Sequence, residues 1–545
     1  MNPARLHRRP LRRRTRLLLA TTGLALTGLL AACTGGSSAV SATGASDTSS
    51  LTNQTWLVPQ DWGAIDPTQE AATNTGTILL VLEPLVLSDG KGGVTSNLAT
   101  QSHPDDLTYV YTVRGGVKFS DGHPLTMADI LYSFQINTAK DSKSNLAGDF
   151  AEVKSISVSG NRLIITMKQP DVLFPTYVSE VGIVEKSVRE ADGPNPGSPG
   201  HLNVGTGPYL VKTYEPGNEV VLVRNPSYWG QKPVAQTITL RLVQDDSARL
   251  LAVRGGTVTG AFEIPASEVP VYNSISGMKV VHGSNPSVVM LNVNTNQAPW
   301  NNQYVRQAAS MAIDKSGIVK AVLDGNGEPA VSVVQQSGME TLLGKSAAAS
   351  RYQKLDLYPY NVQAAKAELA KSPVPHGFHG TLLYSQAEET SGLVAQAVSQ
   401  ELKGIGIDLT VKSLPDSEYT DEVFFKHSAG PAIVDFTTDL PDPASLANYL
   451  ANSSNELANG GYTDIANWST PADDALLDKY LELPETDTAL RGQVLSQILT
   501  NIAHDQPYIP IYNQDYLAVV QSDINFSGFD GMWWMRRWIN EISVG

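Results

Sequence analysis

The segment VDFTTDLPDPAS at residues 434–445 concentrates side chains that could bind a cation. It places Asp435, Asp439 and Asp442 among prolines, directly after the apolar residues PAIV, so we expect a loop with acids at the end of a strand. A carboxylate that faces a closed, dry cleft forms a stronger charge-assisted hydrogen bond with a ligand cation than one at a surface. The residues alone equally allow Asp439 and Asp442 to cap the turns that the prolines impose.

The second group with chemical potential is the thiol of Cys33, the single cysteine among 545 residues. Seven arginines crowd the first 16 residues and an apolar run follows at residues 17–32, which is the pattern of a secretory signal peptide. This run is shorter than the roughly 20 residues of a spanning helix, so a permanent anchor is the weaker interpretation. The letters LAAC at residues 30–33 resemble the lipobox of bacterial lipoproteins, which implies cleavage before Cys33 and acylation of its sulfur. A chance cysteine in an ordinary signal peptide is the alternative.

Charge and composition exclude several partners and chemistries. Removal of residues 1–32 takes away seven arginines and no acids, which leaves a formal charge of about −22. Such a surface repels nucleic-acid phosphates and anionic lipid, so we expect neither to bind it. Without a thiol beyond Cys33, the chain has no disulfide, no cysteine-based metal site and no thiol nucleophile.

Enzyme motifs are missing from the sequence. There is no G-x-S-x-G, no Walker A, no H-E-x-x-H and no dinucleotide-binding G-x-G-x-x-G between a strand and a helix. His376 and His379 lie three apart among Pro and Gly without a third ligand, so we interpret them as loop residues rather than a metal site. We therefore expect no enzyme, no metal site and no cofactor. An exported, lipid-anchored hydrolase is the alternative from another class.

Aromatic side chains are the remaining candidates for a binding site. The chain has eight tryptophans and 20 tyrosines. Rigid rings with a polar edge supply contact area at little cost in entropy, which suits a binding cleft. For any single ring, packing in the core or on the surface is the more frequent role.

The elements that must position these groups differ between the two halves of the chain. In the first half, TYVYTV at residues 108–113, RLIITM at 162–167 and VVLV at 220–223 predict strands. The small polar residues 34–50 predict a flexible tether in front of the globular part.

In the second half, helices alternate with strands. Residues 301–313 place Val305, Ala308 and Ala312 on one helical face, with Asn301 or Asn302 as the cap. The next example is an apolar helical face at residues 394–405 that ends at glycines, followed at once by a strand at 407–412. This order predicts a layered α/β lobe.

Several segments together resemble the family 5 solute-binding proteins of ABC importers, the oligopeptide and dipeptide receptors and their relatives. The segment LTYVYTVRGGVKFSDGHPLTMADILYSF (residues 107–134) resembles the family signature, with F-x-D-G-x-P-x-T before a helix. GTGPYLVKTYEPGNEVVLVRNPSYWG (205–230) matches the G-T-G-P-Y and N-P-x-Y-W segment. YVRQAASMAIDKSGIV, KGIGIDL, DLPDP and QPYIPIYN follow in the family's order.

The resemblance implies an α/β fold of the two-lobed periplasmic-binding-protein type II (cluster C) with an extra subdomain. Ligand would lie between the lobes, which would close by hinge motion before delivery to the permease. The implied boundaries are residues 1–32 for the lipoprotein signal peptide, 33–50 for the lipidated tether, 51–86 with 204–292 and 512–545 for lobe I, 87–203 for its extra subdomain, and 293–511 for lobe II.

The resemblance also implies site residues. In the peptide-binding members an aspartate of the segment that matches FTTDLPDP receives the peptide's N-terminal ammonium, and its match here is Asp439. The backbone of Phe436, Thr437 and Thr438 would pair with the peptide as an added strand, and Tyr512 is a weaker candidate for the cleft wall. The family often has Gly-Trp where this chain has Asp435-Phe436, which leaves an oligosaccharide or a nickel chelate open as the ligand.

Together these features predict an extracytoplasmic, lipid-anchored substrate-binding subunit of an ABC importer, most simply for peptides. We expect a monomer at the outer face of the cell membrane. Its partners would be a peptide or other small solute, the permease subunits, and the bilayer through acylated Cys33, without nucleic acid.

Overall fold

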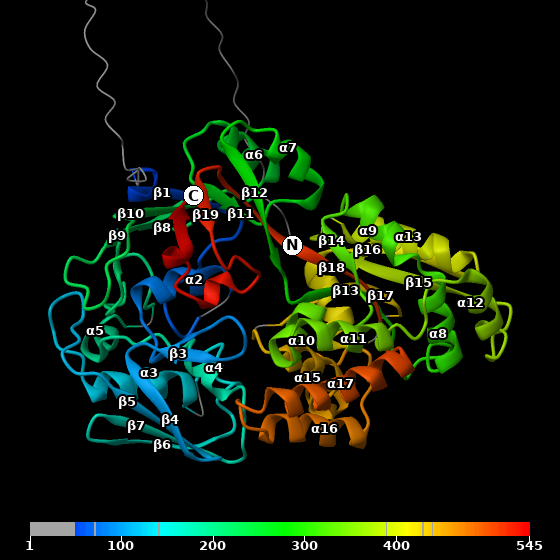
Figure 1. The fold of residues 1–545 in the computed structure, drawn as a ribbon, viewed down its shortest axis with the longest axis horizontal. Helices are drawn as coiled ribbons and strands as arrows, with labels where there is room; N and C mark the ends of the chain where they lie inside the picture. Colours follow the sequence, from blue (N-terminus) through cyan, green and yellow to red (C-terminus); the bar gives the residue numbers. More distant parts are fainter. Residues whose placement is uncertain are drawn as a thin grey trace, which may run out of the picture. The chain divides into compact units, whose positions relative to one another are not determined.

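A sheet of 12 strands runs through the part of the chain that the structure describes (Figure 1). The structure is a computed structural model that describes residues 49–69, 72–139, 142–193, 195–388, 390–427, 430–438 and 440–545. Residues 1–48, with Cys33 and the expected signal peptide, and Asp439 lie outside the described residues. The strands, in order across the sheet, are β16 (Ile407–Leu414), β15 (Phe378–Ser385), β17 (Ala432–Thr437), β13 (Ser287–Asn292), β18 (Tyr508–Gln521), β11 (Gly260–Phe262), β1 (Asn53–Val58), β10 (Thr237–Leu242), β9 (Glu219–Arg224) and β8 (Tyr209–Glu215), with β12 (Met278–Ser284) and β14 (Gly327–Pro329) also paired to β18.

The long strand β18 joins two groups of strands in this sheet, one from β16 to β13 and the other from β11 to β8. Its first residues pair with β13, where Leu291 lies opposite Ile509. Its last residues pair with β11 and β12, where Ala261 and Val280 both lie opposite Val519. Because only residues 285 and 286 separate β12 from β13, the chain passes between the two groups of strands there and again within β18.

A separate four-stranded antiparallel sheet forms in the first half, in the order β4 (Ala99–Asp105), β5 (Thr108–Val113), β7 (Arg162–Met167) and β6 (Val153–Ser159). The predicted alternation is confirmed, since Tyr109, Tyr111 and Val113 are buried while their neighbours are partly exposed. Helix α3 (Met127–Thr138) packs against this sheet and shares its hydrophobic core. The other elements in this half of the chain are α1 (Ser49–Thr52), α2 (Ala72–Val81), β2 (Val86–Ser88), β3 (Val94–Ser96), α4 (Phe174–Val178), α5 (Lys186–Ala191), α6 (Asp246–Arg254) and α7 (Val269–Asn273).

The helices expected in the second half are present. Helix α8 (Gln303–Ala312) begins after Asn302, whose side chain accepts a hydrogen bond from Tyr304 N, and its buried face holds Val305, Ala308 and Ala312. Helix α13 (Ser391–Lys403) leads through glycines into β16, as predicted. The other helices are α9 (Lys315–Val322), α10 (Gln336–Leu343), α11 (Lys345–Leu355), α12 (Val362–Leu369), α14 (Asp416–Thr420), α15 (Pro443–Ala451), α16 (Pro471–Glu482) and α17 (Thr488–Asp505). Strands β19 (Ile524–Phe526) and β20 (Ile542–Val544) close the chain.

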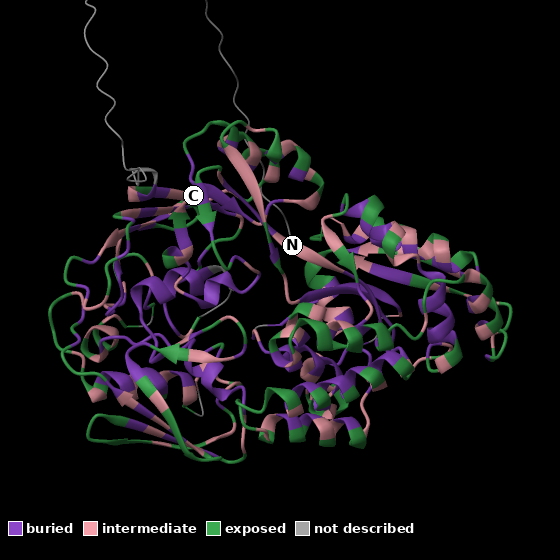
Figure 2. Cartoon of the chain, viewed as in Figure 1, coloured by how far each residue is buried: buried purple, intermediate pink, exposed green. Residues whose placement is uncertain are grey.

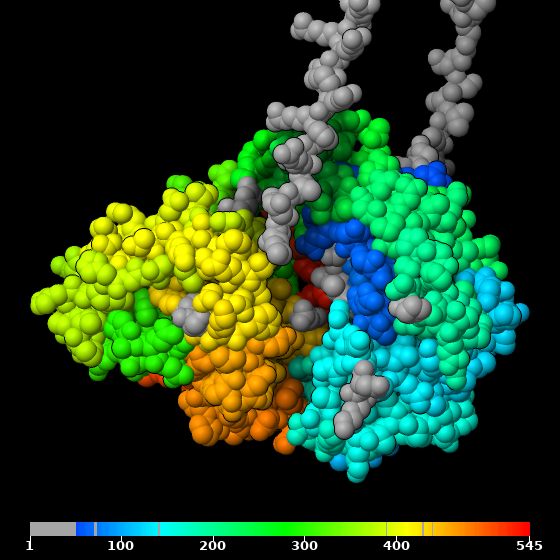
Figure 3. Space-filling model, turned by 180° about the vertical axis from the view of Figure 1, so that it is seen from behind, coloured from blue at the N-terminus to red at the C-terminus, as the bar shows by residue number. Residues whose placement is uncertain are grey.

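Burial follows the layers of the fold (Figure 2). The central strands of the large sheet, such as β13, are buried along their whole length, while exposed residues gather on the outer helical faces. Seen from behind, the four-stranded region (cyan) lies beside the helices of residues 471–505 (orange) (Figure 3). The two regions are linked by a hydrogen bond of 2.9 Å that Val172 N donates to Leu481 O. Within the described ranges, no helix combines the length and the apolar character of a membrane span.

One local expectation was wrong. Asp435, Phe436 and Thr437 were expected in a loop after the PAIV residues, but they are the last residues of β17. The reason is strand pairing, because Thr437 lies opposite Ser287 and Phe436 opposite Val288 of β13. An acid within a strand points to one defined face, so Asp435 is positioned by the sheet rather than by a turn.

Candidate functional site

Two cavities lie beside the segments that pass between the two groups of strands, and they share Thr438 and Met532. The smaller cavity has a volume of about 100 Å³ and the larger about 550 Å³, a size that fits a small-molecule or peptide site. The larger one is lined from the ends of β11 and β17, from the middle of β18 at residues 514–517, from residues 387, 388 and 390, and from residues 531–534.

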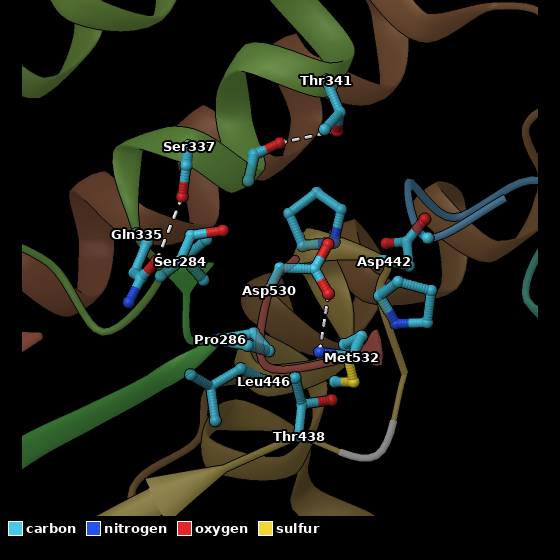
Figure 4. Close-up of a pocket in the computed structure, with 15 residues that line it drawn as sticks. Ser284, Pro286, Gln335, Ser337, Thr341, Thr438, Asp442, Leu446, Asp530 and Met532 are labelled. Atoms are coloured by element: carbon cyan, nitrogen blue, oxygen red, sulfur yellow. Dashed lines mark hydrogen bonds between the residues drawn. The ribbon is translucent and has the colours of Figure 1, made fainter. Parts of the chain in front are cut away.

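The smaller cavity lies between α10, the start of α15 and the C-terminal segment (Figure 4). Ser337 and Thr341 come from α10, and Pro286 comes from the short link between β12 and β13. On the C-terminal side, Asp530 Oδ1 accepts a hydrogen bond of 2.8 Å from Met532 N. This cavity has a mostly apolar wall, so it offers little charge to a ligand.

Asp442 lines the smaller cavity but is engaged by the fold. Its carboxylate caps α15 by accepting a hydrogen bond of 2.9 Å from Ala444 N. It also accepts 2.8 Å from the hydroxyl of Tyr480 and forms a buried ion pair with Arg491. The capping interpretation is therefore confirmed for Asp442.

Strand β17 presents its residues to two faces. Asp435, Thr437 and the following Thr438 line the larger cavity. Phe436 is not among the lining residues of either cavity, because its ring packs on the opposite face, 6.0 Å from the ring of Phe424 and 6.4 Å from that of Tyr449. Asp439 lies outside the described residues.

Tyr512 lies behind the cavity wall. It is fully buried in β18 and is not among the residues that line either cavity. Its hydroxyl lies 3.4 Å from Oγ1 of Thr390, which does line the larger cavity. Tyr512 can therefore position Thr390, whereas its own contact with a ligand requires a movement of that residue.

One edge of β17 is open beside the larger cavity. On one side β17 pairs with β13 along its whole length, from Ala432 to Thr437. On the other side, among the described residues, it pairs with β15 at Ala432 alone, and the Tyr419 hydroxyl donates 2.5 Å to Ile433 O, so the edge without a strand neighbour is that of residues 434–437. An unpaired strand edge offers N–H and C=O groups that an extended chain can pair with.

Carboxylates dominate the larger cavity. Asp246, Glu263, Glu388, Asp435 and Asp515 line it, and Arg249 is the one basic side chain among the described lining residues. The guanidinium of Arg249 is already engaged, since it pairs with Asp246 and donates to the carbonyl oxygens of Val243 (3.0 Å) and Glu263 (2.9 Å). The field inside the cavity thus favours a cationic ligand.

The carboxylate of Asp435 has few partners within the fold. Its Oδ2 accepts a long hydrogen bond of 3.4 Å from Gln514 Nε2, and its buried Oδ1 has no hydrogen-bond partner among the described residues. Burial, and then the charge of Glu388, raises the pKa of Asp435 to about 7. Burial also raises the pKa of Glu388 itself. A cation placed between them would stabilise the ionised forms of both.

Backbone strain accompanies the opposite wall. Glu263 follows β11 with a φ of 54°, in the left-handed region that few residues with a side chain adopt. Arg249 holds this conformation through the Glu263 carbonyl, and the hydroxyl of Tyr516 donates 2.9 Å to the Glu263 carboxylate. The strained residue points its carboxylate to a wall of the cavity, which is where such strain is often found.

An aromatic wall completes the larger cavity. Trp533 and Trp534 line it, and Trp533 stacks on Phe262 with ring centroids 4.1 Å apart and planes at 1°. In contrast, Trp56 and Trp538 are fully buried in the core. Some tryptophans therefore pack in the core, and others line the cavity.

Sequence reasoning named Asp435 but missed the other four acids of the larger cavity. Each of these acids is a single residue on a different element, and only the fold brings Asp246, Glu263 and Glu388 together. Their spacing in the sequence carries no signal. For Asp435, the position of an acid between Val434 and Phe436 was the available signal.

Comparisons with known proteins agree with this architecture. Residues 93–457 match the family model described as bacterial extracellular solute-binding proteins, family 5 middle. The probable D,D-dipeptide-binding periplasmic protein DdpA of Escherichia coli (strain K12) is 24% identical over 81% of this chain and 84% of its own length. The oligopeptide-binding protein AppA of Bacillus subtilis (strain 168) is 24% identical over 76% of this chain and 78% of its own length, and both relatives bear the names of binding proteins.

Solved structures show the same fold. The structure of the periplasmic binding protein DppA from Helicobacter pylori in complex with the peptide STSA aligns with a TM-score of 0.73, at 20% identity over 90% of this chain and 98% of that one. That of NikZ from Campylobacter jejuni in complex with Ni(L-His) aligns with a TM-score of 0.72, at 18% identity over 90% and 99%. The expected two-lobed periplasmic-binding-protein α/β fold is therefore confirmed, and the chain belongs to family 5 of the bacterial extracellular solute-binding proteins.

Proposed function

We propose that this chain is the substrate-binding lipoprotein of an ABC importer, and that it captures peptides in the larger cavity on the outer side of the cell membrane. The observation that carries the proposal is the open edge of β17 beside a cavity lined by five carboxylates. The edge can pair with any peptide main chain, and the carboxylates favour an ammonium group. Relatives that bind a dipeptide or the peptide STSA support this choice.

The proposed binding mode follows the direction of β17. The ligand's main chain pairs with the backbone of Phe436, Thr437 and Thr438, and its N-terminal ammonium reaches Asp439. Main-chain pairing is common to all peptides, so affinity does not depend on one side-chain sequence. A ligand that contacts both walls stabilises the closed form and shifts the population toward it.

The lobe boundaries expected from the sequence form part of the proposal: residues 51–86, 204–292 and 512–545 as lobe I, 87–203 as its extra subdomain, and 293–511 as lobe II. Hydrophobic packing supports the added subdomain, because one core cluster draws its buried members from residues 85–183. A second cluster, from residues 289–512, includes Val289 and Leu291 of β13, and a third draws on both proposed lobes. The larger cavity takes lining residues from both proposed lobes, such as Trp533 and Asp435.

A ligand screen by thermal unfolding tests the proposal. A ligand at 100 times its Kd should stabilise the protein by about 2.7 kcal/mol. We expect a rise in Tm with short peptides that have a free amine. The rise should be smaller with counterparts that are acetylated at the N-terminus, and with counterparts that are methylated at the main-chain amides. A rise with oligosaccharides alone, stacked on Trp533 and Trp534, would contradict the peptide assignment.

A nickel chelate is the second candidate, because the five carboxylates favour a compact cation and NikZ was solved with Ni(L-His). Nickel with histidine therefore belongs in the same screen. A rise in Tm with this complex and none with peptides would move the assignment to it.

The variant Asp439→Asn tests the ammonium contact. A hydrogen bond to a charged group contributes about 1.5–3 kcal/mol, so we expect affinity for peptides to fall about 10- to 100-fold by calorimetry. Asp408→Asn is the matched control, because Asp408 is partly exposed and pairs with Lys403 at 3.4 Å, away from the cavity. Unchanged peptide affinity in Asp439→Asn would show that this residue serves the turn alone.

A further inference from the structure

Asp121, His123 and Glu185 bring three metal-ligand atoms together, and none of the three residues lines the two cavities described above. His123 Nδ1 lies 3.0 Å from Asp121 Oδ2 and 3.0 Å from Glu185 Oε1. Glu185 is 62 residues away from His123 in the sequence. No sequence pattern connects residues this far apart, and the expectation of no metal site was based on His376 and His379 alone.

The backbone holds two of the ligands in a fixed turn. Gly122, between Asp121 and His123, has a φ of 98°, which a residue with a side chain rarely adopts. Gly122 N donates 3.0 Å to Phe119 O, and Phe119 N donates 2.8 Å to His123 O. The two side chains thus leave the same side of a closed turn and are positioned before any ion binds.

Glu185 supplies the independent observation that points to a ligand. It is the residue before α5 and only 5% exposed. Its Oε1 lies 3.0 Å from His123 Nδ1 and accepts a hydrogen bond of 2.8 Å from the Ser187 hydroxyl. Its buried Oε2 has no hydrogen-bond partner among the described residues. A buried carboxylate oxygen without a partner carries a desolvation cost, so most such atoms in folded proteins have a partner.

Distances of 3.0 Å fit both an ion pair and a shared ion, so the unpartnered oxygen of Glu185 distinguishes the two. Ligand atoms about 2.1 Å from an ion lie about 3.0 Å apart at neighbouring octahedral positions and about 3.4 Å apart at tetrahedral ones, so a tetrahedral ion requires a small shift of these side chains. A histidine and carboxylate ion pair explains the contacts of Nδ1 but leaves Oε2 unsatisfied. An ion that Glu185 binds through both oxygens would engage Oε2 as well.

We propose that Asp121, His123 and Glu185 form a binding site for a divalent transition-metal ion with the chemistry of Zn²⁺. Two carboxylates and a neutral imidazole balance the charge of such an ion, and a nitrogen ligand favours it over Ca²⁺, which takes six to eight oxygens. The exposed side of His123 leaves positions for water. A bound ion would link the turn before α3 to the start of α5 and so brace this region.

Zinc titration of the full-length chain tests the site, with Cys33→Ser in every sample so that no thiol competes. We expect calorimetry with ZnCl₂ to show one ion per chain, and CaCl₂ to show none. His123→Gln and Glu185→Gln should each weaken zinc binding by about tenfold or more. The control His379→Gln should not change it, since His379 Nδ1 lies 3.6 Å from a single carboxylate, that of Asp408.

Thermal unfolding gives the second readout. Zinc should raise the Tm of the parent chain and of His379→Gln, but not of the two site variants, whose folding without zinc is checked by circular dichroism. The proposal is overturned if the parent chain binds no zinc, if it prefers calcium, or if both site variants bind zinc as tightly as the parent. These outcomes are independent of peptide binding.

Discussion

Two aspartates seven residues apart show how surroundings assign roles to single residues. Asp442 caps α15, accepts a hydrogen bond from a tyrosine hydroxyl and pairs with an arginine, so its role is structural. Asp435 has a buried oxygen without a partner and faces a cavity. The same side chain is thus a structural group in one place and a candidate ligand contact in the other.

The raised pKa of Asp435 predicts a pH dependence of stability. Its pKa in the folded protein is about 7 against an ordinary 3.8, so between these values the folded chain binds more protons than the unfolded chain. The free energy of unfolding should therefore fall as pH rises through this window. Asp435→Asn should flatten that fall in urea unfolding at pH 4, 6 and 8.

The same variant has a ligand readout and a control. A cationic ligand favours the ionised carboxylate, so its binding near pH 7 should release a proton from the parent chain and fewer from Asp435→Asn, as measured by calorimetry in two buffers. Asp408→Asn, at a partly exposed site away from the cavity, should behave like the parent in both assays. Equal pH profiles for all three chains would refute the role given to Asp435.

At the scale of elements, the segment after β17 is fixed by helices far along the chain. Arg491 of α17 pairs with Asp442 and donates 2.9 Å to the hydroxyl of Tyr480 from α16. All three side chains are buried, so the buried ion pair joins α16 and α17 to the start of α15. This arrangement sets the position from which Thr438 reaches both cavities.

Removal of Arg491 should therefore be severe. Arg491→Met leaves Asp442 buried without its cation, and breaking such a pair costs about 3–5 kcal/mol. Arg241→Met removes an exposed pair with Glu219 at 3.1 Å and should cost less than about 1 kcal/mol. Urea unfolding measures both, and similar losses for the two variants would contradict the structural role of Asp442.

At the scale of the whole molecule, the proposed closure requires contacts that form across the two lobes. Val172 N and Leu481 O, from the proposed subdomain and lobe II, already form such a contact at 2.9 Å. If ligand binding closes the protein, small-angle X-ray scattering should show a smaller radius of gyration with peptide than without it. An unchanged radius with saturating peptide would argue against hinge closure.

Attachment to the membrane is the other property of the whole molecule. The proposed acyl chains on Cys33 contribute about 0.8 kcal/mol of membrane affinity for each buried methylene. Cys33→Ser should therefore move the protein from the membrane fraction to the soluble fraction or the medium, with its peptide affinity unchanged. Continued membrane association of Cys33→Ser would disprove lipid anchoring through this residue.

The sequence by itself determined the local elements and the family. Alternating residues in β5 and the apolar face of α8 predicted these elements correctly, because their periodicity reflects burial on one face. Motifs such as F-x-D-G-x-P predicted the fold because they recur in a fixed order along the chain, and the family match confirms that prediction.

Only the tertiary structure decided which polar groups meet. The acids at 246, 263 and 388 reach one cavity with Asp435, and Glu185 reaches His123, through contacts between elements distant in the sequence. It also decided that Asp435 belongs to β17, since pairing with β13 extends the strand to Thr437. Local patterns encode burial and turn formation, whereas the partners of a charge depend on how the sheet and the helices pack.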